Sequence, residues 1–430
     1  MKAKGIFYTA LLGLAILLFY GGFATLWALD YHKFNIFWTD LWGVYLLVWK
    51  PTGATLPFYD LFGVLSWRDC HLLGTDVMYA NPCDPLARLS NYSPLWYLLP
   101  IGGRDDVMFL GALMSGSFLV LLPLMIRPAS KGELAMSVVA AISSSTLFAV
   151  ERANVDIVMF LMALAVVWLW RTGRRWPAYG MVMAAAALKF YPLALFGLAA
   201  REPGRRFAIA TLVCALSTIL FIAIFWEELQ RLPDLMPKPV YFGDNFGAKL
   251  FGLGMTEQLD LAPIAIPLLT LLLTGLCFWG ALRIAACLGS ALERSFWNRR
   301  EGALLLAGAL IMVGCFFATA NVAYRAIFLL MTLPGFFLLR RIGLKRLGAY
   351  GLFAVLFCLN AEPLRRFTVW PRSAPTFLPE FFWGHIPEGF FFLARETIWW
   401  SLIALLGGVI LTFFRQTPLF AMLTQKERGA

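Results

Sequence analysis

The chain has 430 residues, of which 60% are apolar and only 14% are charged, and its formal net charge at pH 7 is +11. Its mean hydropathy is +0.73, and its apolar share is well above the roughly 45–50% of ordinary soluble domains. This composition excludes a disordered chain, a disulfide-dense secreted module and an ordinary cytosolic enzyme. In a soluble protein this positive net charge would suggest a nucleic-acid partner. In a membrane protein, the asymmetric distribution of Lys and Arg across the membrane is another source of positive charge.

Uncharged apolar runs predict membrane-spanning helices. About 20 apolar residues cross the hydrocarbon layer, and solid runs of this kind exclude the alternating strands of a barrel. The long runs are 6–28, 107–126, 134–150, 207–226, 261–282, 302–324 and 397–414, and the shorter ones are 157–170, 326–339 and 347–361. We therefore predict an all-α polytopic membrane protein with about ten spans, forming a single integral membrane domain over residues 1–430.

The segment 176–200 is a special case. It consists of two short apolar pieces interrupted by Lys189-Phe190-Tyr191-Pro192, and arginines flank both of its ends. Each piece is too short to span a membrane alone. This pattern favours a re-entrant pair that enters from the cytosol and exposes its break to an internal cavity. A single kinked span is the alternative. Counting the pair, 10–12 membrane segments are expected.

The distribution of Lys and Arg predicts the orientation, because basic residues gather on the cytosolic side. With the N-terminus inside, the cytosolic segments hold 21 basic and 5 acidic residues, whereas the rest of the chain holds 15 and 20. Both termini are then cytosolic, and the net charge needs no nucleic acid as a partner. The long outer loops are 29–93, 227–260 and 362–396. We expect a multi-pass protein of the bacterial cytoplasmic (inner) membrane.

The cysteine and acidic residues give only weak indications of a disulfide or a metal site. Cys70 and Cys83 share the first outer loop, and for a periplasmic loop a disulfide and two separate thiols both stay open. No Cys/His spacing suggests zinc. A metal is not indicated, although a site at Asp69 and Asp76 also stays open.

Three cations, Arg152, Lys189 and Arg325, lie in the expected outer half of the bundle. Their structural alternative is simple: Arg152 pairs with Glu151 or Asp156, and Arg325 reaches the outer headgroups. However, topology does not require cations on the outer side, and polar residues at membrane depth are costly. Together the three cations predict a phosphate-binding pocket.

Four motifs make the prediction more specific. They are Asp60-Leu61 followed by Val64, Asn91-Tyr92-Ser93-Pro94, Arg152-Ala153-Asn154 at the start of a span, and Lys189-Phe190-Tyr191-Pro192 after the next apolar stretch. Over roughly residues 56–200 these motifs resemble glycosyltransferase family 87 of the GT-C superfamily, the polyprenol-phosphate-sugar-dependent transferases. The family's later outer turn often carries His-Trp. Here Asn321, Tyr324 and Arg325 occupy that turn, so no histidine is carried over.

The resemblance implies a GT-C-like bundle whose long first outer loop carries amphipathic helices and the catalytic aspartate. It also implies an inverting hexosyltransferase, which moves a sugar from a polyprenyl-phosphate donor to an acceptor hydroxyl on the outer face. Mannose is the commonest donor sugar in the family, and the acceptor is a glycolipid or a polysaccharide. The lipid-linked sugar is a substrate, so no cofactor is expected.

Inversion requires a carboxylate that accepts the proton of the acceptor, and cations that receive the leaving phosphate. The family-like context and an amphipathic surrounding favour Asp60 as the general base, with a helix-capping role as the alternative. Arg152, Lys189 and Arg325 are predicted to bind the donor phosphate. The residues predicted to bind sugar or acceptor are Asn91, Tyr92, Asn154, Asp156 and Tyr324.

Two other functions fit some of these features. A transporter or flippase for a lipid-linked sugar would also have a broken helix with a lysine at membrane depth. The absence of an internal repeat in the sequence disfavours it. An outer-face glycan polymerase or ligase would share the outer arginines, but would tend to rely on one very large outer loop.

Overall fold

The computed structural model describes residues 2–36, 58–236, 238, 240, 245–318, 320–369 and 386–427. Parts of all three expected outer loops therefore lie outside the described residues, namely 37–57, 237, 239, 241–244 and 370–385.

The described chain is built almost wholly of helices, which confirms the all-α polytopic class. The N-terminal half contains α1 (Lys2–Ile36), α2 (Tyr59–Leu72), α3 (Leu95–Leu98), η2 (Arg104–Asp106), α4 (Val107–Ile126), α5 (Lys131–Ala141), α6 (Ser144–Arg152), α7 (Asp156–Arg171), α8 (Arg175–Leu188), η3 (Tyr191–Arg201) and α9 (Gly204–Ile224). The C-terminal half contains α10 (Trp226–Leu235), β1 (Asn245–Phe246), α11 (Leu250–Leu259), α12 (Ala265–Ala291), η4 (Arg294–Asn298), α13 (Arg300–Ala318), β2 (Asn321–Val322), η5 (Ala323–Thr332), α14 (Leu333–Arg341), α15 (Lys345–Leu359), α16 (Ala361–Val369), α18 (Ile386–Arg415) and α19 (Pro418–Glu427).

Seven helical segments among the described residues are long and apolar enough to cross a membrane, and the pair α5–α6, bent by 46°, is an eighth if it forms one span. The prediction of ten spans also counted runs 157–170 and 347–361. These form α7 and α15, helices of 16 and 15 residues, which fall short of the roughly 20 residues that a span requires. The expected span 302–324 ends early, because α13 stops at Ala318.

The bundle has a central and a peripheral layer. α13 and the segment formed by η5 and α14 are mostly buried inside the protein, whereas only 11% of the most apolar window of α9 and of α12 is buried. The exposed faces of α9 and α12 carry leucines and other large apolar side chains, which is the pattern of helices that face lipid.

The two apolar pieces of segment 176–200 form the helix α8 and the 3-10 helix η3, which pack against each other as a hairpin. Both ends of this hairpin lie together, because Glu202, just after η3, accepts a hydrogen bond from Tyr179 and pairs with Arg175 in the first turn of α8. Lys189 lies at the opposite end, where the chain reverses. We call α8 and η3 the α8–η3 hairpin.

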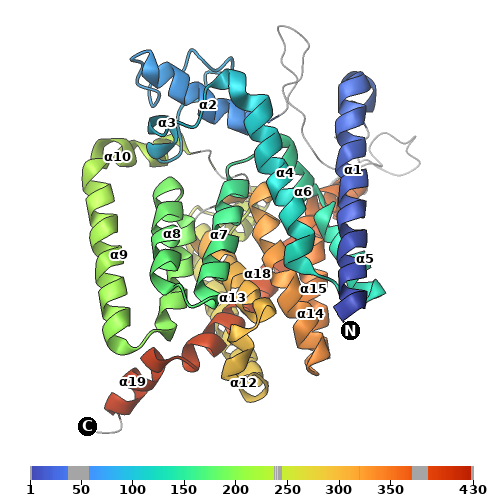
Figure 1. Ribbon diagram of the computed structural model, residues 1–430, viewed down its shortest axis with the longest axis vertical. Coiled ribbons are helices and arrows are strands. Elements are labelled where there is room, and N and C mark those ends of the chain that lie inside the picture. Colours follow the sequence, from blue (N-terminus) through green and yellow to red (C-terminus); the bar gives the residue numbers. More distant parts are fainter. Residues whose placement is uncertain are drawn as a thin grey trace.

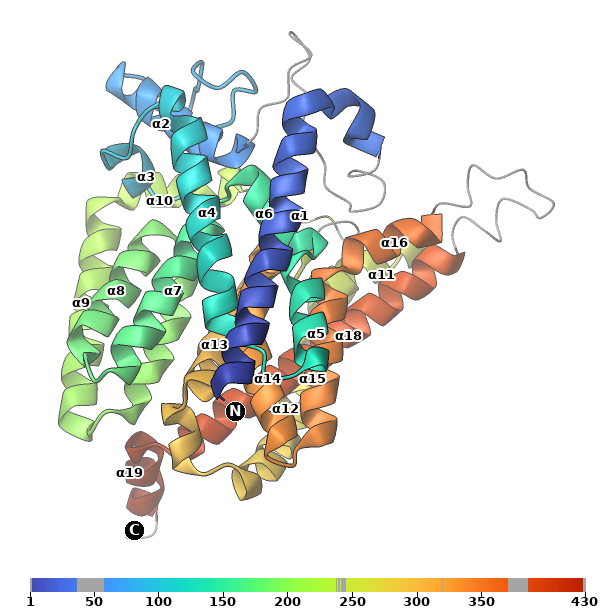
Figure 2. The same cartoon turned by 45° about the vertical axis from the view of Figure 1, so that its right-hand side comes forward.

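Figures 1 and 2 show the two ends of the bundle. Helices α2, α3 and α10 lie across one end, and α19 and the start of α1 lie at the other. We call these the α2 end and the α19 end. Near the site, β1 and β2 form a minimal antiparallel sheet in which Asn245 pairs with Val322 and Phe246 with Asn321.

Candidate active site

Asp60 lies in the first turn of α2, and its carboxylate contacts the end of α6 and the turn that follows it. Asn154 donates a hydrogen bond from Nδ2 to Asp60 Oδ2 at 2.7 Å, and Arg152 Nη1 lies 3.3 Å from Oδ1. Arg88 Nη1 is 4.0 Å from the same oxygen. The Asp60 side chain is 19% exposed, so it is held in place but still accessible.

Phe58, the residue before α2, anchors the start of this helix against α6 and α4. Phe58 has a left-handed backbone (φ 60°) and donates its N–H to the Glu151 carbonyl at 2.8 Å. Its ring packs so tightly over α4 that a Cβ added to Gly111 would lie 2.2 Å from a ring carbon. A residue without a side chain is required at position 111 for this approach. These contacts place Asp60 beside the end of α6.

The turn between α6 and α7 places Asn154 between the Asp60 carboxylate and the backbone N–H of Asp156. Ala153 ends α6 in the left-handed region, with φ 40°. The Asn154 Oδ1 atom accepts the Asp156 N–H at 2.9 Å, while its amide donates to Asp60. Asn154 therefore connects the start of α7 to the start of α2.

Asp156 is the centre of a second polar cluster. Its carboxylate accepts hydrogen bonds from Lys189 Nζ at 2.5 Å, Tyr191 Oη at 2.7 Å and Arg325 Nε at 3.2 Å. Its side chain is fully buried. Arg325 also donates to Asn321 Oδ1, which ties the β2–η5 turn to the start of α7 and to the break of the α8–η3 hairpin.

The two clusters carry opposite formal charge. Around Asp156, one carboxylate faces two cations, Lys189 and Arg325, which leaves an excess of one positive charge. Around Asp60, the cations are Arg152 and Arg88, but Glu151 lies 3.2 Å from Arg152 and Asp84 2.6 Å from Arg88. Counted with every group ionised, three carboxylates against two cations leave a formal excess of one negative charge.

Aromatic side chains lie between the clusters. Lys189 Nζ lies 4.6 Å from the centre of the Tyr92 ring. Trp96 donates its indole N–H to the Leu188 carbonyl at 3.0 Å, which fixes this loop on the hairpin break. Burial, reinforced by nearby negative groups, raises the pKa of the Tyr92 phenol well above its ordinary value, so its hydroxyl stays protonated.

The structure therefore brings together nearly all the residues singled out in the sequence. Asp60, Arg152 and Asn154 share one cluster, Asp156, Lys189 and Arg325 share the second, and Tyr92 and Tyr324 lie beside both. Asn91 is half-buried and immediately precedes Tyr92. Arg152 pairs with Glu151, as its structural alternative stated, and also with Asp60. Asp156, the other partner which that alternative offered to Arg152, is instead the counterion of Lys189 and Arg325.

Two site residues were not identified from the sequence. Arg88 donates to the Tyr59 carbonyl at 3.0 Å, and its guanidinium lies 3.7 Å from the centre of the Tyr59 ring. Tyr191 belongs to the Lys189-Phe190-Tyr191-Pro192 motif, but only its hydrogen bond to Asp156 shows a role for its side chain. The motif was a signal for Tyr191. A single loop arginine gives no comparable signal.

The remaining expectations concern the surrounding loop. Cys70 and Cys83 form a disulfide. Asp69 pairs with Arg104, and Asp76 lies 3.5 Å from Arg231. Among the described residues, no group of three or more His, Cys, Asp or Glu side chains is arranged to hold a metal ion.

Comparison with known proteins identifies the family of the chain. The family model of glycosyltransferase family 87 matches residues 95–317, which is more than half of the chain. The match includes Arg152, Asn154, Asp156 and Lys189, whereas Asp60 lies before it. No curated protein and no solved structure matches the chain. The resemblance seen in the sequence motifs is thus confirmed, and the chain belongs to glycosyltransferase family 87, as a multi-pass membrane glycosyltransferase.

Proposed function

We propose that the protein transfers a sugar from a polyprenyl-phosphate donor to an acceptor hydroxyl, with inversion, and that Asp60 is the general base. The donor is proposed to carry a mannose-type hexose, and the acceptor to be a glycolipid or a polysaccharide. The reaction takes place at the α2 end, which the positive-inside rule assigns to the outer face of a bacterial inner membrane, with both termini cytosolic.

The separation of charge between the two clusters is the observation that carries this proposal. A polyprenyl-phosphate sugar is an anionic phosphodiester, and it gains a second negative charge when it leaves as a phosphate monoester. Preorganised cations stabilise that charge in a site from which water is excluded. The excess positive charge at Lys189 and Arg325 fits the leaving phosphate, and the excess negative charge around Asp60 fits proton abstraction.

Exposure distinguishes the two aspartates. Asp60 is 19% exposed at its side chain, whereas Asp156 is fully buried and accepts three hydrogen bonds. A general base must reach the proton that it takes, so Asp60 suits this role. We assign Asp156 to the positioning of Lys189 and Arg325.

In the proposed reaction, the acceptor oxygen attacks the anomeric carbon on the side opposite the phosphate. The new carbon–oxygen bond forms as the bond to the phosphate oxygen breaks, and the electron pair leaves with polyprenyl phosphate. Asp60 takes the hydroxyl proton. Arg152 and Asn154 orient the Asp60 carboxylate, so we place Arg152 beside the base. Tyr92 and Tyr324 lie close to both Asp60 and Asp156 and are proposed to contact the sugar.

The experiment uses purified protein in liposomes, polyprenyl-phosphate mannose and a panel of glycolipid and polysaccharide acceptors. We expect release of polyprenyl phosphate together with glycosylated acceptor. Asp60→Asn should abolish release but retain donor binding, since the amide cannot take the proton. Asp105→Asn, at an exposed carboxylate near the same end, is the matched control and should stay active.

Two results would count against the proposal. Full activity of Asp60→Asn would remove Asp60 as the base. Movement of intact lipid-linked sugar across the liposome membrane, without release of polyprenyl phosphate, would instead indicate a transporter.

A further inference from the structure

A further polar cluster, separate from those around Asp60 and Asp156, lies at the base of the α8–η3 hairpin, at the α19 end. Arg175 and Arg201 begin and end the hairpin, and their guanidinium carbons lie 4.3 Å and 5.6 Å from the centre of the Trp170 ring. A helix rises about 1.5 Å per residue, so the 14 residues of α8 separate this base from Lys189 by roughly 20 Å. The cluster is thus remote from the candidate active site.

Three hydrogen-bond donors in this cluster lack acceptors within the described part of the chain. They are the indole N–H of Trp170 and one terminal guanidinium nitrogen, Nη1, of both Arg175 and Arg201. Trp170 is 1% exposed. A buried donor without a partner costs about 1–3 kcal/mol, and more when it is charged. Three of them around one ring therefore indicate that an acceptor-rich group binds here.

The charges agree with an anionic ligand. Glu202 is engaged already, because it lies 3.5 Å from Arg175 Nε and accepts the Tyr179 hydroxyl. Burial, together with the nearby cations Arg175 and Arg294, lowers the pKa of Arg201. Positive charges held close together at a partly buried site are stabilised by an anion that they share.

Two separate cavities adjoin the cluster, one beside Arg201 and Arg294 and the other beside Arg175. A cavity of about 160 Å³ is lined by Arg201, Arg294, Trp297, Gln416 and Thr417, among others. A second cavity, of about 200 Å³, is lined by Arg175, Trp176, Tyr179, Glu202 and Arg206. One water molecule needs only about 10–15 Å³ on this measure, so each cavity accommodates a larger group.

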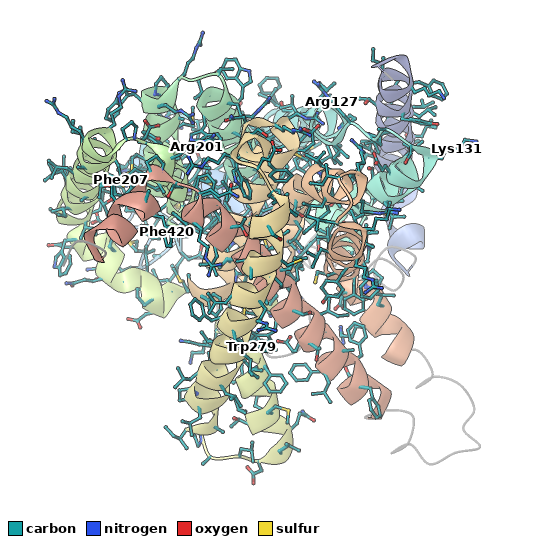
Figure 3. All side chains as sticks on the ribbon, turned by 90° about the horizontal axis from the view of Figure 1, so that it is seen from below. Arg127, Lys131, Arg201, Phe207, Trp279 and Phe420 are labelled. Carbon is teal, nitrogen blue, oxygen red and sulfur yellow. A yellow bond between two sulfur atoms is a disulfide. The ribbon has the colours of Figure 1, made fainter. Side chains whose placement is uncertain are left out.

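The surroundings identify the source of the anion. In Figure 3, which views the molecule from below, Arg201, Arg127, Lys131, Phe207 and Phe420 lie on the face presented. Trp176 and Phe420 are 50% and 40% exposed, and α19 packs on η3 and α9. Apolar and aromatic side chains around a basic pocket are typical of sites where a protein binds an anionic lipid at the membrane interface.

We infer that the base of the α8–η3 hairpin, formed by Trp170, Arg175, Arg201 and Arg294, binds a phosphate oxyanion, namely the headgroup of an anionic phospholipid. The ligand would hold the two ends of the hairpin together at the α19 end, while Lys189 serves the α2 end. The site does not depend on the proposed transferase mechanism.

The test measures thermal unfolding of the delipidated, full-length protein in detergent. Phosphatidylglycerol, phosphatidylcholine and inorganic phosphate are added separately at matched ionic strength. We expect phosphatidylglycerol, but not phosphatidylcholine, to raise the Tm of the wild-type protein. Arg201→Gln should weaken the apparent affinity for phosphatidylglycerol by about tenfold, as expected for one lost charge-assisted hydrogen bond.

Two further variants make the test specific. Trp170→Phe removes one donor and keeps an aromatic ring for packing, so it should also weaken the lipid effect. Arg205→Gln removes an exposed charge that lines neither cavity, and it should respond like the wild type. If inorganic phosphate raises the Tm as much as the lipid does, the oxyanion site stands and its ligand is free phosphate.

The inference is overturned if phosphatidylglycerol and phosphatidylcholine affect the wild-type Tm equally. It is also overturned if phosphatidylglycerol stabilises Arg201→Gln and Trp170→Phe as strongly as the wild type.

Discussion

Asn154 and Asp60 are 94 residues apart in the sequence and are joined by a hydrogen bond of 2.7 Å between Nδ2 and Oδ2. Because the other end of the Asn154 amide accepts the Asp156 N–H, this side chain cannot rotate without losing both bonds. Asn154 thus fixes the orientation of Asp60 relative to the cluster that contains Lys189 and Arg325.

We expect Asn154→Ala to lower kcat by about 10²-fold, the cost of misplacing a reacting group by roughly 1 Å, with little change in donor KM. Steady-state release of polyprenyl phosphate measures both. Asn298→Ala, at an exposed asparagine of the α19 end, is the control. A large rise in donor KM with unchanged kcat would show that Asn154 binds the donor and does not position Asp60.

Asp156 should be the most important residue of the site for stability. Asp156→Asn leaves Lys189 and Arg325 buried without their carboxylate, and breaking a buried ion pair costs about 3–5 kcal/mol. We expect a clearly lower Tm in detergent, whereas Asp260→Asn at an exposed position should leave the Tm unchanged.

A double variant separates lost pairing from general damage. Combining Asp156→Asn with Lys189→Met removes one of the stranded cations, so the loss of stability should be smaller than the sum of the two single losses. Strict additivity would contradict the ion-pair explanation.

The long membrane spans, and most of the residues that come together in the candidate site, could be predicted from the sequence, for physical reasons. A helix that crosses the hydrocarbon layer needs about 20 consecutive apolar residues, so uninterrupted apolar runs predict the long spans. Lys189 interrupts an apolar stretch with arginines at both ends, which indicated the hairpin break. Polar residues at membrane depth are costly, which directed attention to Arg152, Asp156 and Arg325.

What the sequence could not predict depends on tertiary packing. The role of Asp156 as a counterion follows from two cations that reach it from residues 33 and 169 positions away. Arg88 is positioned by the fold of the loop over Tyr59, and no pattern marks it. The pairing of β1 with β2 involves two residues from each strand, too few to produce an alternating pattern.

Lys189 should act on the departing phosphate through its charge. Lys189→Met removes this charge but leaves Asp156 paired with Arg325, so the fold should persist. We expect a fall in kcat of about 10²-fold, comparable to the loss of one preorganised charge-stabilising donor, and a higher donor KM. Lys189→Arg keeps the charge and should recover part of the activity. Lys131→Met, at an exposed lysine, is the control. Equal defects in Lys189→Met and Lys189→Arg would indicate that the shape of the side chain, and not its charge, is required.

The disulfide between Cys70 and Cys83 should stabilise the segment that carries Asp60. The two cysteines are 13 residues apart, and closing a loop of this size contributes about 3 kcal/mol. Cys70 lies near the C-terminal end of α2 and is fully buried, so the bond also anchors this part of the helix. We expect the variant Cys70→Ser/Cys83→Ser to be cleaved faster by protease between residues 59 and 92, and to lose activity as Asp60 loses its fixed position.

Cys287→Ser, which removes an exposed cysteine outside the disulfide, should match the wild type in both assays. If cleavage within residues 59–92 is equally slow in the double variant, the hydrogen bonds and ion pairs of the loop are sufficient to hold Asp60 without the disulfide.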